Sequence, residues 1–600
     1  MNHHTTQQPA QQPQISSPQM DFQVYVMGGL FLVILILVVI SKGELGRKKQ
    51  KLGDARKATP REIKKAKDYG FDMMEERKRN KVALWVGEPK GVVINRETRE
   101  IFVPRDYVNS WILSHLEEHL VALGSTGSGK SYSLLNPLQR SMIKLGYPLA
   151  VFDAKGHEES ETSTCPSSEI AGYARLHGYK VKIIAPGYDD SDVFNIYHMI
   201  RSRFGREAYE DKDGAGVVSE VLSENLAKTA ADNGDEFFPL AAKQLLQSVF
   251  LLALYLDPNA NFVLAFYLLE RIVEIGAAGI RSLDLPPYLR SSFSQYLASE
   301  KSAETGASIA GTTLLQFNRM FTPANVATFC GQSTVELEIK GKTLVIFRLN
   351  PELKASVGPM IATTIQCFML ANAYRAREQP LGFILDECQM VKLCGVQEMQ
   401  TVTRSNGVFF VFASQGFSFL KRTYGEKGAM GLIEGCKTQV IGQLNANEPA
   451  EYYSKQFGQK EIKSRSKSKS SGKHSSNSES DQPHLKDLVP LQELLGLPQG
   501  QFYYLNRAIR NERMARIPVL YETVIPKWEE KEIKQGITEW FRYRKVARAN
   551  SKALAKSDDE LIRYQTLARE ALPEPEPDQQ QPLPSQEDGN QTLAIGIASL

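Results

Sequence analysis

The stretch HLVALGSTGSGKS, residues 119–131, decides the fold of this 600-residue chain. It begins as an aliphatic run typical of a buried strand and continues into the pattern G-x-x-x-x-G-K-[ST]. The eight members of the pattern are Gly124, Ser125, Thr126, Gly127, Ser128, Gly129, Lys130 and Ser131. Residues 131–145 follow with a pattern typical of a helix. Because backbone N–H groups of such a turn cradle phosphate oxygens, the stretch predicts a P-loop nucleotide-binding domain of the α/β class.

A second segment supplies the acids that such a site needs. Residues 382–387, Gly-Phe-Ile-Leu-Asp-Glu, form an apolar strand that ends in two carboxylates. Lys130 is predicted to bridge the β- and γ-phosphates, while Ser131 and, through water, Asp386 hold Mg²⁺. Glu387 is predicted to polarise the attacking water as a general base. Since this second acid has a catalytic task, the pair favours a hydrolytic ATPase with ATP and Mg²⁺ as cofactors over a GTPase switch or a nucleotide kinase.

Two further polar side chains flank the apolar run VFFVFA, residues 408–413. Gln415 follows the run, where its carboxamide can hydrogen-bond the γ-phosphate or the attacking water. Arg404 precedes it at the end of a predicted helix, where it can complete a neighbouring subunit's site as an arginine finger. The alternative is that Arg404 only complements the helix dipole, and the spacing alone does not separate these interpretations.

The wider pattern is that of an α/β protein with an inserted helical domain. Between 205 and 330 the pattern becomes helical, and the apolar run at 241–256 contains Gln244 and Gln247 before it stops at Asp257-Pro258. This run therefore predicts a buried helix rather than a membrane span. The alternation of short aliphatic runs with helices is typical of β-α-β units. We expect strands at 119–123, 147–153, 180–186, 343–349, 383–386 and 408–413.

Composition excludes several classes of protein. Hydrophobic residues make up 42% of the chain and charged residues 23%, which is ordinary for globular proteins and excludes collagen-like, coiled-coil and wholly disordered chains. The net charge of +4 argues neither for nor against a nucleic-acid partner. The six cysteines form no C-x-x-C pair, so we expect reduced thiols.

Residues 24–40 are uncharged and almost wholly apolar. At about 1.5 Å per residue a helix of this length is near the lower limit for crossing a bilayer. Residues 1–23 contain no Lys or Arg, which disfavours a signal peptide, whereas residues 42–81 contain fifteen Lys and Arg against seven Asp and Glu. The positive-inside tendency predicts a single-pass inner-membrane protein whose bulk is cytoplasmic. The segment 42–81 is interpreted either as a lipid-headgroup contact or as a solvated basic helix.

Taken together, these motifs resemble the conjugative coupling proteins of type IV secretion systems, within the FtsK/HerA group of RecA-like motors. The resemblance extends from about 85 to 525. Besides the two nucleotide motifs, VFDAKGHEE at 151–159 is similar to the family's strand and Asp-x-Lys-Gly turn. Residues 403–425 resemble its arginine–strand–glutamine block.

The resemblance implies a RecA-like motor that assembles as a homohexamer. Such a motor brings relaxosome proteins and single-stranded DNA to the inner-membrane components of the secretion channel. It further implies that Arg404 acts in trans, that Gln415 senses the γ-phosphate and that 205–330 is the family's all-α domain. Many members have two membrane helices, whereas this sequence has one such segment.

The expected organisation has eight parts. They are an extracytoplasmic tail (1–23), a transmembrane helix (24–41), a basic juxtamembrane segment (42–81), the RecA-like domain in two parts (82–204 and 331–530, with a mobile loop at 460–482), the all-α domain (205–330), a C-terminal helical segment (531–570) and a disordered acidic tail (571–600). The loop is either a DNA contact or a solvated linker, and the tail is either a docking peptide for a basic relaxosome protein or a solubiliser.

Two other functions fit the same motifs. One is a platform that receives effector proteins and uses nucleotide only for assembly. The other is a chromosomal DNA translocase of the same superfamily, although the acidic tail stands where such proteins usually carry a winged-helix module. DNA-stimulated ATP hydrolysis separates a motor from a platform.

Overall fold

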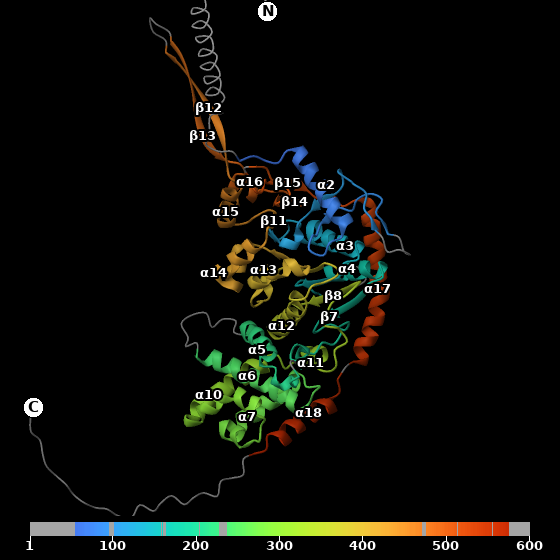
Figure 1. Ribbon diagram of the computed structural model, residues 1–600, viewed down its shortest axis with the longest axis vertical. Coiled ribbons are helices and arrows are strands. Elements are labelled where there is room, and N and C mark those ends of the chain that lie inside the picture. The colour runs from blue at the N-terminus through green and yellow to red at the C-terminus, as the bar shows by residue number, and fades with distance from the viewer. Residues whose placement is uncertain are drawn as a thin grey trace, which may run out of the picture. The chain divides into compact units, whose positions relative to one another are not determined.

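The computed structural model describes residues 55–94, 101–157, 159, 164–202, 205–226, 237–470, 476–512, 514–554 and 556–574 (Figure 1). The predicted transmembrane helix at 24–41, the tail before it and most of the acidic tail lie outside these residues. Within the described ranges, no helix combines the length and the apolar character that crossing a bilayer requires. The chain divides into two units, residues 56–457 with 488–600, and residues 1–55 with 458–487.

A nine-stranded sheet forms the centre of the larger unit, and all six predicted strands are confirmed in it. The strand order is β15-β14-β11-β5-β10-β9-β6-β8-β7. The seven strands from β11 to β7 are parallel, whereas β14 and β15 add to one edge antiparallel. The strands are β5 (Leu120–Leu123), β6 (Leu149–Asp153), β7 (Lys180–Ile184), β8 (Thr343–Arg348), β9 (Leu381–Leu385), β10 (Val408–Ser414), β11 (Thr438–Ile441), β14 (Gln501–Leu505) and β15 (Val519–Glu522).

The central strands are hydrophobic throughout because both faces of the sheet are covered. Every residue of β5, β6, β9, β10 and β11 is buried, as expected for a parallel sheet between layers of helices. The helices of this domain are α3 (Asn136–Lys144), α4 (Pro166–Leu176), α12 (Lys354–Ala373), α13 (Val396–Asn406), α14 (Phe417–Gly435), α15 (Asn447–Phe457) and α16 (Leu491–Leu495). Two short antiparallel pairs precede β5, β1 (Leu84–Val86) with β4 (Trp111–Leu113) and β2 (Val93–Ile94) with β3 (Ile101–Phe102).

Part of the basic segment 42–81 belongs to this unit, which the sequence did not predict. Helix α2 (Pro60–Glu76) begins with a capping box between Thr59 and Glu62 and buries Phe71 and Met74 in the main core. The Lys67 ammonium donates a hydrogen bond to the Tyr107 carbonyl oxygen at 2.7 Å, and burial lowers the pKa of Lys67 to about 8. The interpretation of 42–81 as a solvated basic helix is therefore wrong for residues 60–76, because the apolar residues of this helix recur on one face and are buried.

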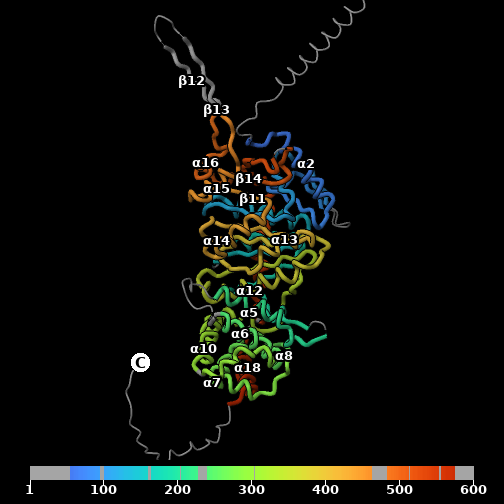
Figure 2. Tube along the Cα trace, turned by 60° about the vertical axis from the view of Figure 1, so that its left-hand side comes forward, coloured from blue at the N-terminus to red at the C-terminus, as the bar shows by residue number. Residues whose placement is uncertain are grey.

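The inserted region forms the expected group of helices, gathered at one end of the larger unit in both views (Figures 1 and 2). Its longest members, α6 and α7, pack against α10, and Val249, Phe250 and Leu269 are completely buried. The helices are α5 (Lys212–Leu226), α6 (Phe237–Leu256), α7 (Phe262–Ser282), α8 (Pro287–Ser292), α9 (Ser294–Ala298), α10 (Ala303–Asn318) and α11 (Pro323–Phe329).

Two C-terminal helices join the sheet domain to the all-α domain. Helix α17 (Lys527–Ala553) packs along α4, and α18 (Asp558–Ala571) packs on α7 (Figure 1). The contact with α4 requires glycine on both sides, because a Cβ at Gly172 would lie 1.9 Å from the Gly536 carbonyl oxygen. Trp540 of α17 is completely buried against this face. The C-terminal segment is therefore a structural part of both domains.

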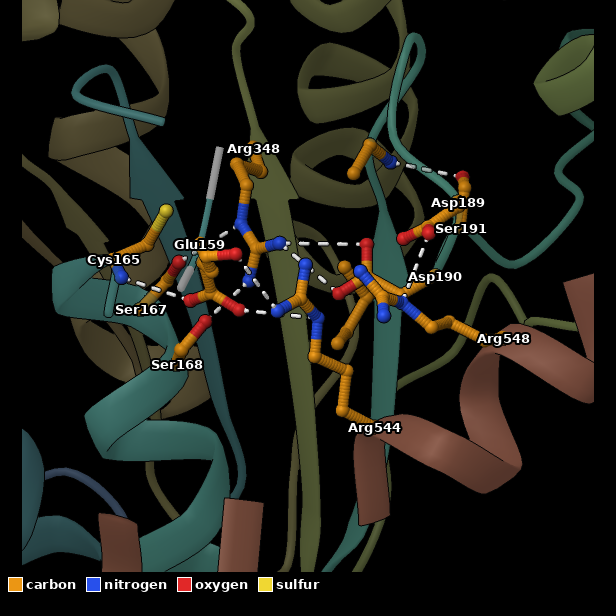
Figure 3. A network of polar contacts seen from close by, with 12 residues as sticks. Glu159, Cys165, Ser167, Ser168, Asp189, Asp190, Ser191, Arg348, Arg544 and Arg548 are labelled. Carbon is orange, nitrogen blue, oxygen red and sulfur yellow. Dashed lines mark hydrogen bonds and ion pairs between the residues drawn. The ribbon is translucent and has the colours of Figure 1, made fainter. Parts of the chain in front are cut away.

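A buried polar network fixes α17 to the carboxyl ends of β7 and β8, with Arg348 at its centre (Figure 3). The Arg348 guanidinium is 1% exposed and pairs with Asp190 at 3.1 Å. It also donates to the hydroxyl groups of Ser167 and Ser168. Glu159 accepts hydrogen bonds from the Trp540 indole at 2.9 Å and the Cys165 backbone at 2.8 Å.

The smaller unit contains a hairpin where the sequence predicted a loop at 460–482. Strands β12 (Gln459–Ser470) and β13 (Ser476–Asp487) pair antiparallel along their whole length. The alternation of a basic residue (Lys or Arg) with Ser from 463 to 470 has the period of two that strands require. Because both alternating sets are polar, composition alone favoured a loop.

Replacing Arg348 by Met tests the network around α17. Removing the cation leaves the buried Asp190 carboxylate unpaired, so we expect the free energy of unfolding to fall by about 3–5 kcal/mol. Arg548→Met is the matched control, because its pair with Asp189 is 42% and 52% exposed and we expect a loss below about 1 kcal/mol. Urea denaturation followed by circular dichroism measures both, and equal losses would contradict the assignment.

Candidate nucleotide-binding site

The P-loop connects β5 to the helix that follows it and is held by the two neighbouring strands. The Gly124 N–H donates to the Ser414 carbonyl oxygen at 3.3 Å, and the Ser125 N–H donates to the Gln443 carbonyl oxygen at 2.6 Å. Gly127 and Gly129 have φ of 84° and 91°, which glycine adopts without strain. Helical structure begins at Lys130, first as a wide turn at Lys130–Leu135 and then as α3.

The Lys130 ammonium lies inside the loop. Its Nζ donates hydrogen bonds to the carbonyl oxygens of Gly124 and of Ser125, the latter at 3.1 Å, and the residue is 5% exposed. Burial lowers the pKa of Lys130, and the nearby Asp386 and Glu387 carboxylates act against this. A buried cation inside a glycine-rich loop is suited to bind phosphate oxygens.

Ser131 and Asp386 meet although β10 lies between their strands. The Ser131 hydroxyl donates to Asp386 Oδ2 at 2.8 Å. The other carboxylate oxygen, Oδ1, is buried and has no hydrogen-bond partner within the described ranges. A hydroxyl and a carboxylate with an unused oxygen fit the ligand preference of Mg²⁺, so these residues would hold the metal of a Mg²⁺–nucleotide.

Glu387 stands beside this pair in a constrained backbone conformation. Its φ is 51°, in the left-handed region that costs a non-glycine residue about 1 kcal/mol. The carboxylate is 7% exposed and accepts a hydrogen bond from the Gln389 amide at 2.7 Å. A fixed carboxylate next to the predicted metal ligands has the position that a general base requires. Gln415 directly follows β10, the strand between the P-loop strand and β9.

Lys155 is a member of the site that the sequence did not assign. It follows β6, and its Nζ lies 2.9 Å from Ser131 Oγ, 2.9 Å from Asp386 Oδ2 and 3.4 Å from Glu387 Oε1. Burial opposes its charge, but the two carboxylates raise the pKa of Lys155 above its ordinary value. In the sequence, the Asp-x-Lys-Gly turn at 153–156 is the pattern that could have identified Lys155 as a site residue.

Arg404 lies at the amino ends of the parallel strands, whereas Lys130 lies at their carboxyl ends. Arg404 is near the end of α13, before β10 begins, and its side chain is 55% exposed. The guanidinium pairs with Glu118 at 2.9 Å, and Arg507 pairs with the same carboxylate. These three residues line a cavity of about 540 Å³ together with Lys437 and Arg516. The structure therefore brings Lys130, Ser131, Asp386 and Glu387 together and leaves Arg404 apart from them.

The family model described as the TraM recognition site of TraD and TraG matches residues 380–499, a fifth of the chain. The resemblance to conjugative coupling proteins is confirmed. No curated protein matches the chain.

Solved structures of the plasmid coupling protein TrwB share this fold. The complex of TrwB with a non-hydrolysable GTP analogue has a TM-score of 0.52 at 13% identity, covering 80% of this chain and 97% of that one. Its complex with a non-hydrolysable ATP analogue has a TM-score of 0.51 at 15% identity, covering 68% and 86%. The complex with ADP and Mg²⁺ gives 0.50 at the same identity and coverage. At these identities the likeness concerns the fold, an α/β architecture with a large, mostly parallel sheet.

His119 lies near Arg404 at the amino end of β5, and its protonation makes the stability of the fold depend on pH. Its Nδ1 accepts from the Phe410 N–H at 3.1 Å, and Nε2 lies 2.8 Å from the Gln400 carbonyl oxygen. This arrangement requires the neutral ring, and burial lowers the pKa of His119 to about 4. The unfolded chain, with an ordinary pKa of about 6.5, therefore binds the proton first as the pH falls.

We expect the stability that His119 contributes to be complete above pH 6.5 and to be lost progressively down to pH 4. Between pH 7 and pH 5 the loss is about 2 kcal/mol. In His119→Gln the decline in the free energy of unfolding between these pH values should be smaller by this amount. The exposed His484→Gln should keep the wild-type decline, and an unchanged decline in the His119 variant would contradict the prediction.

Proposed function

We propose that the chain is an ATP-hydrolysing coupling protein that recruits relaxosome proteins and single-stranded DNA to a type IV secretion channel and drives their conjugative transfer. The observation that carries this proposal is the convergence of Lys130, Ser131, Asp386 and Glu387 at the carboxyl edge of the sheet. The shared fold with TrwB, whose complexes contain ADP with Mg²⁺ and nucleotide analogues, supports nucleotide binding.

Each residue of the site has a role in this proposal. Lys130 and the loop amides bind the β- and γ-phosphates, and Ser131 with Asp386 holds Mg²⁺, which supplies charge stabilisation for phosphoryl transfer. Glu387 accepts a proton from the attacking water. Gln415, at the end of the intervening strand, contacts the γ-phosphate or that water.

The remaining parts of the proposal concern partners and location. The match of 380–499 to a TraM recognition region supports a relaxosome protein as partner. The apolar segment 24–41, followed by basic residues, supports anchoring in the inner membrane with the motor in the cytoplasm. In this arrangement a homohexameric ring holds the DNA backbone through basic groups rather than by reading bases.

Glu387→Gln and Lys130→Ala test the hydrolytic site. We expect the wild-type protein to hydrolyse ATP faster when single-stranded DNA is added. Glu387→Gln should bind ATP with nearly wild-type affinity but hydrolyse it about a hundredfold more slowly, because the base is lost. Lys130→Ala should lose nucleotide binding, and both variants should fail in a mating assay. Phosphate release and equilibrium nucleotide binding measure the two effects separately.

The exposed Glu398→Gln of α13 is the matched control and should behave as wild type. Nucleotide binding without hydrolysis in the wild-type protein, with or without DNA, would contradict the motor and favour the effector-receiving platform.

Mixing two inactive variants tests whether Arg404 works in a neighbouring subunit. Arg404→Ala keeps Glu387, and Glu387→Gln keeps Arg404, so a mixed ring contains some sites with both groups. We expect each variant alone to be nearly inactive and an equal mixture to recover up to about a quarter of wild-type hydrolysis. Arg542→Ala, whose side chain is 78% exposed on α17, should hydrolyse ATP normally. A mixture as inactive as its components would exclude action in trans.

A further inference from the structure

Lys155 has contacts that the proposed hydrolysis mechanism does not use. Its ammonium lies 2.9 Å from both Ser131 Oγ and Asp386 Oδ2. These two groups are also the ones that the P-loop pattern assigns to Mg²⁺. One side chain of the protein thus presents a positive charge to both predicted metal ligands.

The position of Lys155 is built into the turn after β6. The Asp153 carboxylate accepts hydrogen bonds from the Lys155 N–H at 2.9 Å and from the Ser167 N–H at 3.1 Å. Gly156 follows, where a Cβ would lie 2.5 Å from the Tyr188 hydroxyl and 2.6 Å from the Leu349 carbonyl oxygen. The backbone of the turn is therefore fixed by a buried acid on one side and by close packing on the other.

The side chain of Lys155 is less constrained than its backbone. It is 42% exposed, whereas Asp386 and Glu387 are 13% and 7% exposed. The carboxylates are thus largely enclosed by protein, whereas part of the lysine side chain is open to solvent. A divalent cation bound to Ser131 and Asp386 would repel an ammonium that lies 2.9 Å from an oxygen of each of these side chains, so each cation disfavours the other.

We propose that Lys155 is a tethered cation that competes with Mg²⁺ for Ser131 and Asp386. This inference rests on the proposed nucleotide site and adds a regulatory step to it: the metal binds only as the ammonium withdraws. The two acids then have a positive partner both before and after the metal binds. Without such a partner, two adjacent carboxylates that are largely buried would destabilise the site.

Replacing Lys155 by Met tests this competition by a gain of affinity, which structural damage would not produce. The probe is Mn²⁺ alone, added to the nucleotide-free protein and measured through the electron paramagnetic resonance signal of the free ion. Because the competing charge is partly exposed, we expect Lys155→Met to bind Mn²⁺ about three- to tenfold more tightly than wild type. Lys155→Arg retains a cation and should remain within about twofold of wild type.

Lys392→Met is the matched control, because Lys392 also pairs with a glutamate and is 38% exposed. It should leave the Mn²⁺ affinity unchanged. If the methionine variant does not fold, Lys155→Gln is measured in its place, because it removes the same charge. Equal or weaker Mn²⁺ binding without the lysine, including no measurable binding in either protein, would overturn the inference. Binding of ADP with saturating Mg²⁺ to the wild-type protein tests the nucleotide site independently, so the two failures can be distinguished.

Discussion

Ser131 and Asp386 are 255 positions apart in the chain, and their side chains are joined by a 2.8 Å hydrogen bond. This contact constrains the arrangement of the rest of the structure. The P-loop strand β5 and the acidic strand β9 must be parallel and end at the same edge, with β10 between them. Along the chain, the helical insertion leaves the sheet after β7 and returns to it at β8, before β9 begins. Because the sheet is covered on both faces, hydrophobic burial stabilises its strands, and the observed strand order brings the two polar side chains together.

The turn after β6 connects the nucleotide site to the second half of the molecule. Lys155, near its start, touches Ser131 and Asp386, and Glu159, four positions later, contacts Trp540 of α17. Helix α17 packs on α4 and leads to α18, which packs on the all-α domain. The predicted metal ligands and the inserted domain are therefore connected through a short series of packed elements, and the buried pair of Arg348 and Asp190 fixes its central part.

Sequence reasoning predicted what depends on local pattern and missed what depends on packing. The six strands, the P-loop and the acid pair were predictable because each is a contiguous stretch with its own period or motif. The contacts of Lys155 were not, since a lysine after a strand gives no sign of which neighbouring strand end it will reach. Helix α2 was hidden by the basic composition of 42–81, although Phe71 and Met74 recur at helical spacing. The hairpin β12–β13 was hidden because both of its alternating sets are polar.

The position of Arg404 follows from the same parallel sheet. It lies before β10 and pairs with Glu118, which precedes β5, whereas Lys130 and Asp386 follow the ends of β5 and β9. The seven residues of β10 separate these edges by about 20 Å at the usual rise per residue. A side chain of about 7 Å cannot span this distance within one subunit. An arginine at the amino edge of the sheet can therefore reach a γ-phosphate only if that phosphate is bound by another copy of the chain. Its exposure and its single acidic partner within the described ranges leave the guanidinium accessible to such a neighbour.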